Sequence, residues 1–247
     1  IGNQRTSNED TFLLKRICNG KYLLSVVIDG VGGCYGGRVA ADIASKCISE
    51  HVSNFADKTN SADVLKAAVI NANNIICSQH CIPSLSEMCC VLTAILINLE
   101  TGCVNVEHIG DTRLYLFKDG VLTKLTSDHT YVGRLEESGQ ITEKEAMTHV
   151  RRNVISRYVG FKELQWGTDY IQTHKLQIPD NCTLLMCSDG LYDMVHSLQM
   201  VKILREPVSV EDKVKNLIDA ALDGGGRDNI TVVLIDVAMD IKENEYE

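Results

Sequence analysis

The stretch Ser25-Val26-Val27-Ile28-Asp29-Gly30-Val31-Gly32-Gly33 decides how this chain folds, because it places a carboxylate where an apolar run stops. Consecutive apolar β-branched residues are typical of a buried strand, and the glycines that follow predict that this strand ends at Ile28. An aspartate at the rim of a core is partly desolvated, so its charge needs a partner, and a divalent cation is the strongest one available. The glycine beside it lets a backbone carbonyl approach a ligand closely.

The same pattern recurs further along the chain. Asp189 follows the apolar run that starts at Leu184, and Asp228 lies just before the last expected strand. Asp111 lies between two strands, where an ordinary hairpin turn is the equally weighted alternative. Carboxylates without His or Cys ligands nearby favour Mg²⁺ or Mn²⁺ over zinc. The sequence therefore predicts a divalent metal site built from strand ends.

The remaining sequence reads as blocks of antiparallel strands separated by helices. Strands are expected at 12–18, 22–28, 90–98, 103–109, 113–118, 121–125, 170–176, 182–188 and 230–237. Helices are expected at 39–55, 63–76 and 209–222. The polar segment 131–152 contains a capping box at Thr142 and Glu145, which predicts a small helical insert. Because strands do not alternate singly with helices, the pattern favours an α+β fold over a parallel α/β fold.

Composition limits the class of protein. The 247 residues include 33 Asp and Glu against 24 Lys and Arg, and this acidic balance argues against non-specific binding to nucleic acid or anionic membranes. No apolar run approaches the roughly 18 residues that a membrane span needs, so none is expected. The ten cysteines include no Cys-x-x-Cys pair, which favours free thiols and a cytoplasmic protein. Six acidic residues at the expected site account for most of the formal charge of −9: Glu9, Asp10, Asp29, Asp111, Asp189 and Asp228.

Seven motifs, spread in order over essentially the whole chain, resemble those of the metal-dependent, type 2C serine/threonine protein phosphatases, in their bacterial form. They are Arg5-x-x-Asn8-Glu9-Asp10, Asp29-Gly30-x-Gly32-Gly33, Gly110-Asp111-Thr112-Arg113, Thr126-x-Asp128-His129, Arg152-Asn153-x-Ile155-x-Arg157, Ser188-Asp189-Gly190-Leu191 and Gly226-Arg227-Asp228-Asn229-Ile230-Thr231. Seven ordered motifs are far more specific than any one of them alone. The resemblance implies a four-layer αββα sandwich, in which two antiparallel sheets are flanked by helix pairs. It also implies a single catalytic domain over residues 1–247, with a flap insert at about 131–152.

The resemblance assigns roles to the acidic residues. It implies two Mg²⁺ or Mn²⁺ ions, bridged by Asp29, with the Gly30 carbonyl on one ion and with Asp189 and Asp228 on the other. Glu9 and Asp10 would act through metal-bound water. Asp111 matches the aspartate of a third ion, whose presence at rest the sequence leaves open. Arg5 matches the residue that clamps the substrate phosphate.

The implied activity is hydrolysis of phosphoserine and phosphothreonine in phosphorylated proteins, by direct attack of a metal-bridging water. The chain is expected to act as a monomer, with no nucleic acid or membrane partner. One alternative is a metal-poor pseudophosphatase that serves as a scaffold, although every matched ligand position is filled. Another is a dinucleotide-binding loop at Gly30–Gly37, which is disfavoured because Tyr35 occupies the place of the third glycine.

Three departures from the family pattern matter. Val31 stands where relatives carry His or Met, so it cannot supply a proton to the leaving group. Cys34 and Arg38 replace residues that are usually His and Glu in bacterial members. The family's first strand normally precedes Arg5 by more residues than stand here, which leaves the completeness of that sheet edge open.

Overall fold

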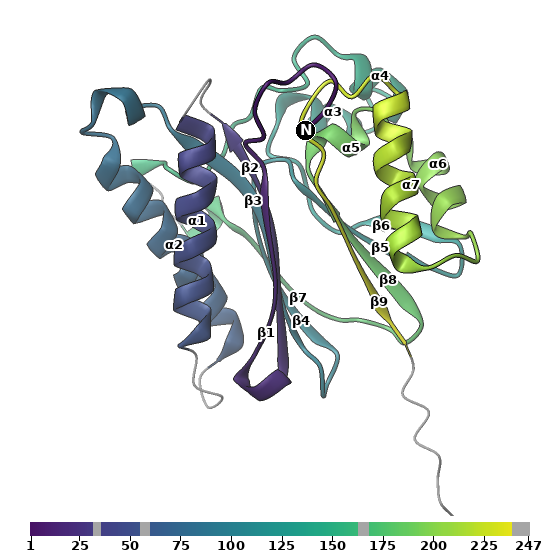
Figure 1. Ribbon diagram of the computed structural model, residues 1–247, viewed down its shortest axis with the longest axis horizontal. Coiled ribbons are helices and arrows are strands. Elements are labelled where there is room, and N and C mark those ends of the chain that lie inside the picture. Colours follow the sequence, from purple (N-terminus) through teal and green to yellow (C-terminus); the bar gives the residue numbers. More distant parts are fainter. Residues whose placement is uncertain (32–35, 55–59, 163–167, 239–247) are drawn as a thin grey trace, which may run out of the picture.

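Two antiparallel sheets lie face to face at the centre of the molecule (Figure 1). The structure, a computed structural model, describes residues 1–31, 36–54, 60–162 and 168–238. The glycines at 32 and 33, and Cys34, Tyr35 and Phe55, therefore lie outside the described residues. The first sheet has the order β1 (Thr11–Ile17), β2 (Tyr22–Val31), β3 (Cys89–Asn98), β4 (Cys103–Ile109) and β7 (Gln172–Gln177). The second has the order β6 (Val121–Lys124), β5 (Arg113–Lys118), β8 (Cys182–Cys187) and β9 (Val232–Val237).

Helices cover the outer face of each sheet. Helices α1 (Gly36–Ser53) and α2 (Ser61–Gln79) pack on the first sheet, whereas α6 (Ser197–Leu204) and α7 (Val210–Asp223) pack on the second. Three short helices lie together at one end of the sandwich: α3 (Tyr131–Glu137), α4 (Glu143–Thr148) and α5 (Asp189–Tyr192). Single 3₁₀ turns occur at Cys18–Gly20, Pro83–Leu85 and Thr168–Tyr170. The αββα sandwich predicted from the sequence is confirmed.

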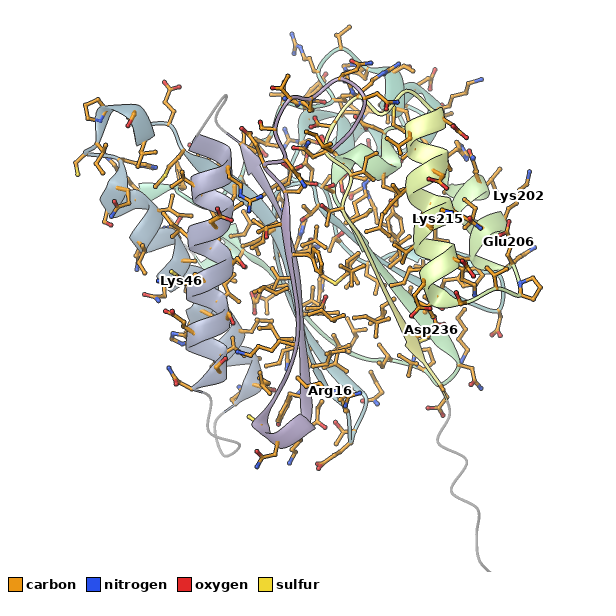
Figure 2. The ribbon with its side chains drawn as sticks, in the orientation of Figure 1. Arg16, Lys46, Lys202, Glu206, Lys215 and Asp236 are labelled. Carbon is orange, nitrogen blue, oxygen red and sulfur yellow. The ribbon has the colours of Figure 1, made fainter. Side chains whose placement is uncertain are left out.

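Strand β2 shows why both faces of a central strand are apolar. Leu24, Val26 and Ile28 point toward α1 and α2, and Val27 points into the layer between the sheets. Side chains alternate along a strand, so position 29 faces the same inner layer as Val27. Many charged side chains instead lie on the outside of the helices, as the labelled Lys46 on α1 and Lys215 on α7 illustrate (Figure 2). The apolar alternation therefore aims Asp29 at the space between the sheets.

Three predicted strand boundaries were wrong. Strand β2 does not end at Ile28, because Gly30 and Val31 continue the ladder opposite Cys90 and Cys89. Gly30 is required there, since the backbone of Gly37 lies where a Cβ would stand. The expected strands at 170–176 and 230–237 begin two residues later than predicted.

Helices α5 and α6 were not foreseen, because each is too short for a clear helical period. The capping box of Thr142 and Glu145 is present as predicted, at the start of α4. The cysteines within the described ranges carry no disulfide, as expected.

Strand β1 forms one edge of the first sheet and carries exposed apolar side chains. Phe12 and Leu14 are 58% and 52% exposed, and both lie on the inner face, opposite Val27 and Ser25. The exposed Lys15 and Arg16 follow them. This edge of the inner layer is therefore less covered than the centre.

One buried carboxyl group lies on the outer face of β4. Glu107 accepts a hydrogen bond from Thr173 Oγ1 at 2.7 Å, but its Oε1 atom is buried without a partner. Burial raises the pKa of Glu107 from 4.5 to about 7, although the positive charge of Lys66 and the Thr173 hydrogen bond oppose the rise. Glu107 therefore binds a proton more tightly in the folded chain than in the unfolded one.

Replacing Glu107 with Gln should make folding less sensitive to pH. In the wild type, the unfolded chain loses this proton near pH 4.5 and the folded chain near pH 7, so stability falls between these values and stays low above them. Glu107→Gln should therefore gain stability relative to wild type as pH rises through that window, by about 2–3 kcal/mol at pH 8. Urea unfolding at pH 4.5, 6 and 8 measures the difference, with the exposed Glu50→Gln as the control. A constant difference at all three values would contradict the shifted pKa.

Candidate active site

A cleft of about 420 Å³ lies at the end of the sandwich where the predicted site residues meet. The cleft brings together residues from the N-terminal segment, β2, the β4–β5 connection, α5 and the segment before β9. The predicted residues that line it are Arg5, Glu9, Asp29, Gly30, Asp111, Asp189 and Asp228. Asp10 is the one predicted ligand that does not line the cleft. The segments that carry these residues span more than 200 positions in sequence, so only the fold assembles the site.

Asp29 and Asp189 are the most strongly perturbed carboxyl groups in the cleft. Desolvation raises the pKa of Asp29 well above its usual value, and the negative charges of Asp10 and Asp189 raise it further. The pKa of Asp189 is also raised well above its usual value, first by burial and then by the charge of Asp111. Both groups therefore lie where ionised carboxylates repel one another and lack water.

The donor set of the cleft fits a divalent cation. Asp189 Oδ1 is buried and has no hydrogen-bond partner among the described residues, so an oxygen ligand is left without a partner. Within the same part of the chain, no three His, Cys, Asp or Glu side chains converge tightly enough to enclose an ion by themselves. Mg²⁺ usually keeps several waters and takes only one or two carboxylates, so such an enclosure is not needed.

Asp10 points into the core beside the cleft. It is 3% exposed, and its Oδ2 atom accepts hydrogen bonds from Ser188 Oγ at 2.8 Å and from Thr231 Oγ1 at 2.7 Å. Burial raises the pKa of Asp10, while these two hydrogen bonds lower it. The side chain thus joins the ends of β1, β8 and β9 beneath the site.

Arg5 and Asp228 form an ion pair at the mouth of the cleft. Arg5 Nη2 donates to Asp228 Oδ2 at 2.5 Å, and Asp228 Oδ1 accepts from the main-chain N–H of Asn229 at 2.8 Å. The Arg5 side chain is 49% exposed, so part of its guanidinium faces solvent. An arginine at this place can donate to a substrate phosphate while it remains close to a carboxylate.

The Asp111 segment is not a hairpin turn, which was the alternative reading of the sequence. It crosses from β4 in the first sheet to β5 in the second. Gly110 has φ +105°, and a Cβ there would clash with the Val91 side chain. Asp111 is 5% exposed, and burial raises its pKa to about 7. This crossing delivers a carboxylate to the cleft from the layer between the sheets.

Sequence reasoning missed several polar residues that support the site. Asn229 Oδ1 accepts the Glu9 amide at 2.8 Å, and Asn229 Nδ2 donates to the Ser7 carbonyl at 2.9 Å, so Asn229 fixes the N-terminal segment. Ser188 and Thr231 hold Asp10, as described above. Asn153 lines the cleft from the chain that follows α4. These residues lie inside the quoted motifs, and that position was the only signal that could have identified them.

Comparison with known proteins identifies the family. The protein phosphatase 2C family matches residues 3–224. The chain is 35% identical to the serine/threonine protein phosphatase PstP of Mycobacterium tuberculosis over 94% of its own length, but it spans only 43% of that relative. It is 31% identical to the serine/threonine phosphatase stp of Listeria monocytogenes, over 85% of this chain and 83% of that one.

Solved structures agree with the sequence matches. The Mycobacterium tuberculosis PstP/Ppp phosphatase superposes with a TM-score of 0.82 and 33% identity, over 96% of this chain and 95% of that one. A structure of the PstP catalytic domain in complex with two manganese ions gives a TM-score of 0.82 and 32% identity, over 96% and 95% of the two chains. The length of the family match, the relatives' identity and the shared fold lead to one conclusion: this chain belongs to the protein phosphatase 2C family.

Proposed function

We propose that the chain is a metal-dependent phosphatase that hydrolyses phosphoserine and phosphothreonine in phosphorylated proteins. The observation that carries the proposal is the buried oxygen of Asp189, which has no partner in the part of the chain that the structure describes. It lies in a cleft where the described lining residues include four further carboxylates and one arginine. Such a cleft repels a phosphate unless cations occupy it, and with cations it attracts one. The catalytic domain of PstP, a relative, is known with two manganese ions.

The proposed ligands come from the family resemblance, and the cleft lining is consistent with them. Asp29, the Gly30 carbonyl, Asp189 and Asp228 would together hold two Mg²⁺ or Mn²⁺ ions. Glu9 and Asp10 would act through water, and Asp111 would hold a third ion. Bound divalent ions supply an activated water and neutralise the phosphoryl oxygens.

The chain's own residues would bind and orient the substrate. Arg5 would donate to the phosphate from the cleft mouth, which fixes the phosphorus relative to Asp29. Gly30 lines the cleft, so its carbonyl is a candidate ligand. Val31 lines the cleft and has no titratable group, so Val31 itself cannot donate a proton to the leaving oxygen. The cleft volume of about 420 Å³ leaves room for a phosphorylated side chain.

The flap insert, residues 131–152 of a single catalytic domain, would select among protein substrates. Helix α4 of the insert contacts α6, because the Glu143 carboxylate accepts from the main-chain N–H of Ser197 at 2.7 Å and from Ser197 Oγ at 2.6 Å.

Within the described residues, no helix is both long enough and apolar enough to cross a bilayer. The monomeric state and the cytoplasmic location stay predictions.

Hydrolysis of p-nitrophenyl phosphate and of a phosphothreonine peptide, with Mn²⁺ and with EDTA, tests the proposed function. Hydrolysis that needs the metal supports it. Binding of the phosphopeptide without turnover would instead support the pseudophosphatase, which acts as a scaffold. That reading is disfavoured here because every matched carboxylate is present.

Asp189→Asn should abolish activity and stabilise the metal-free protein. The substitution removes a ligand charge, so turnover should fall by more than about 10³-fold. It also removes repulsion with Asp111, so the metal-free protein should gain about 0.5–2 kcal/mol. Thermal unfolding in EDTA and kinetics in Mn²⁺ measure both effects, with the exposed Asp219→Asn as the control. A marked loss of stability in EDTA would count against the metal-ligand role.

Arg5→Ala should raise KM for phosphate esters more than it lowers kcat. Loss of a charge-assisted contact costs about 1.5–3 kcal/mol, equivalent to a KM increase of about 10–150-fold. Arg5→Lys should recover only part of the loss, because lysine cannot bind a phosphate with two parallel hydrogen bonds. Steady-state kinetics check this, with Arg16→Ala on β1 as the control. Unchanged KM and kcat would remove Arg5 from the phosphate site.

Asp111→Ala should lower kcat by about 10²–10⁴-fold for phosphopeptides, if the role of Asp111 is to assist departure of the leaving oxygen. The loss should be smaller for p-nitrophenyl phosphate, whose leaving group needs little protonation. Calorimetric titration with Mn²⁺ should show that the two tighter sites remain. An equal drop on both substrates would return Asp111 to a purely structural role.

A further inference from the structure

The three residues that connect β4 to β5 are each held by a group from another part of the fold. The Gly110 amide donates to His129 Nδ1 at 3.0 Å, and the Gly110 carbonyl accepts from the His129 amide at 2.7 Å. The Thr112 hydroxyl lies 2.7 Å from the Thr93 hydroxyl. Between these two, the Asp111 carbonyl accepts a hydrogen bond from the Tyr192 hydroxyl at 3.0 Å. Tyr192 is therefore the group that fixes the Asp111 main chain from the side of the second sheet.

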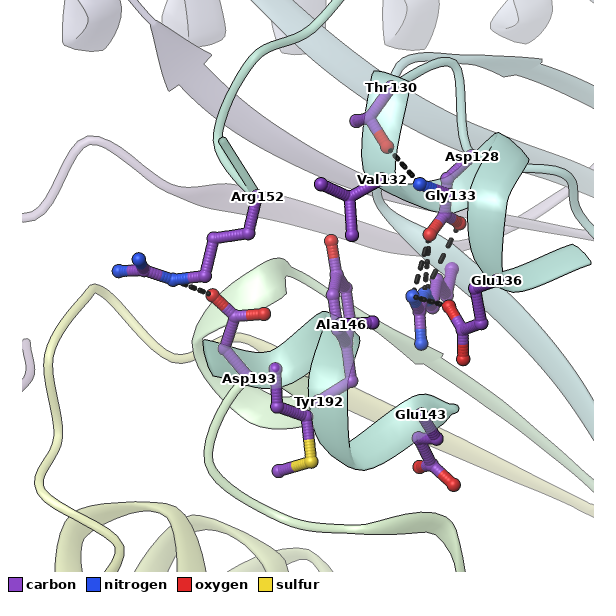
Figure 3. Close-up of a pocket in the computed structure, with 12 residues that line it drawn as sticks. Asp128, Thr130, Val132, Gly133, Glu136, Glu143, Ala146, Arg152, Tyr192 and Asp193 are labelled. Carbon is purple, nitrogen blue, oxygen red and sulfur yellow. Dashed lines mark hydrogen bonds and ion pairs between the residues drawn. The ribbon is translucent and has the colours of Figure 1, made fainter. Parts of the chain in front are cut away.

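Tyr192 is the last residue of α5, the helical turn that begins at Asp189. It is 7% exposed, and its ring lies under the guanidinium of Arg113, 3.6 Å from the ring centre. Figure 3 shows the Tyr192 side chain standing between Asp193 on one side and Asp128 and Glu136 on the other. This turn of helix therefore begins with the cleft carboxylate of Asp189. It ends with Tyr192, which holds the main chain of Asp111.

Arg113 keeps the Tyr192 ring in place. Arg113 Nε and Nη2 donate to Asp128 Oδ2 at 3.0 and 2.6 Å, and Nη2 also reaches Glu136 of the flap helix α3 at 3.2 Å. A buried arginine with several charged hydrogen bonds has little freedom to move. The tyrosine below it therefore has one position, and its hydroxyl meets the Asp111 carbonyl in that position.

We propose that Tyr192 is a positioning residue for Asp111, which sets the separation of the Asp111 and Asp189 carboxylates in the cleft. The inference rests on the proposed function, because it assigns Tyr192 to the support of a proposed metal ligand. Mutation of a residue that holds a metal ligand in place typically changes metal affinity or activity by 10–100-fold. Sequence reasoning gave Tyr192 no role.

The test compares Tyr192→Phe with Tyr115→Phe. Both substitutions remove one hydroxyl from a buried tyrosine beside Arg113, since the Tyr115 hydroxyl accepts from Arg113 Nη1 at 3.0 Å. Only the Tyr192 hydroxyl contacts Asp111. The first readout is hydrogen exchange of the segment 109–113 in metal-free protein. The second readout is a titration with Mn²⁺, which measures the affinity of the site that is expected to be lost in Asp111→Ala.

Tyr192→Phe should speed hydrogen exchange in segment 109–113 and weaken binding of that ion by about 10–100-fold. Tyr115→Phe should change the affinity for the ion by less than about threefold. Tyr192→Phe should also lower kcat for phosphopeptides more than for p-nitrophenyl phosphate. In the Asp111→Ala background, it should cause no further loss of kcat.

Identical exchange and Mn²⁺ binding in the two tyrosine variants would overturn the proposal. A wild type that binds Mn²⁺ but hydrolyses neither substrate would refute the proposed function alone. A wild type that does not bind Mn²⁺ would also refute the proposed function. In that case the exchange comparison in metal-free protein still decides whether Tyr192 holds Asp111.

Discussion

Repulsion among carboxylates that have little access to bulk water is the constraint on which the site depends. Strands β2 and β8 are apolar on their two faces, so they bury whatever polar group follows their last apolar residue. Asp29 and Asp189 occupy such positions. Burial raises the pKa of both, and the negative charge of Asp189 raises the pKa of Asp29 further. A site of this kind is costly when empty and favourable when cations fill it. The fold therefore favours the binding of cations at this site even when no substrate is bound.

The rest of the site is organised to keep these charges in place. Asp10 receives two hydroxyl hydrogen bonds from other strand ends, and Asn229 ties the N-terminal segment to the turn before β9. Behind the cleft, the ion pair of Arg113 with Asp128 is nearly inaccessible, with side-chain exposures of 7% and 3%. A buried pair of this quality is a modest source of stability, but it restricts the geometry of everything that contacts it. Here the contacts include the flap and α5.

Much of the fold and the cleft could be predicted from the sequence, for identifiable reasons. The apolar runs on β2 and β8 and the glycines beside Asp29 and Asp189 are local signals, so they survive in the sequence alone. The continuation of β2 to Val31 could not be predicted, because it depends on pairing with Cys89 and Cys90, some 60 positions away. The change of sheet at Asp111 could not be predicted either, since a glycine followed by an aspartate is compatible with either a hairpin or a crossing between sheets.

The supporting residues were hardest to predict, because their roles exist only in three dimensions. Tyr192 reads as an ordinary apolar position in a short helix until its hydroxyl is seen to meet a carbonyl 81 positions earlier. Asp10 reads as a ligand like Glu9, yet the first turns to the core and the second to the cleft. Both residues precede β1, so only the folded path of this segment shows which way each side chain points.

The exposed Phe12 and Leu14 on β1 have a consequence for how the protein behaves at high concentration. An edge strand offers unpaired backbone donors and acceptors, and apolar side chains beside them make edge-to-edge association favourable. Lys15 and Arg16 directly follow, and their like charges oppose the stacking of two such edges. Because that protection is electrostatic, added salt weakens it. Colloidal stability of the purified protein is therefore expected to depend on ionic strength through this one strand.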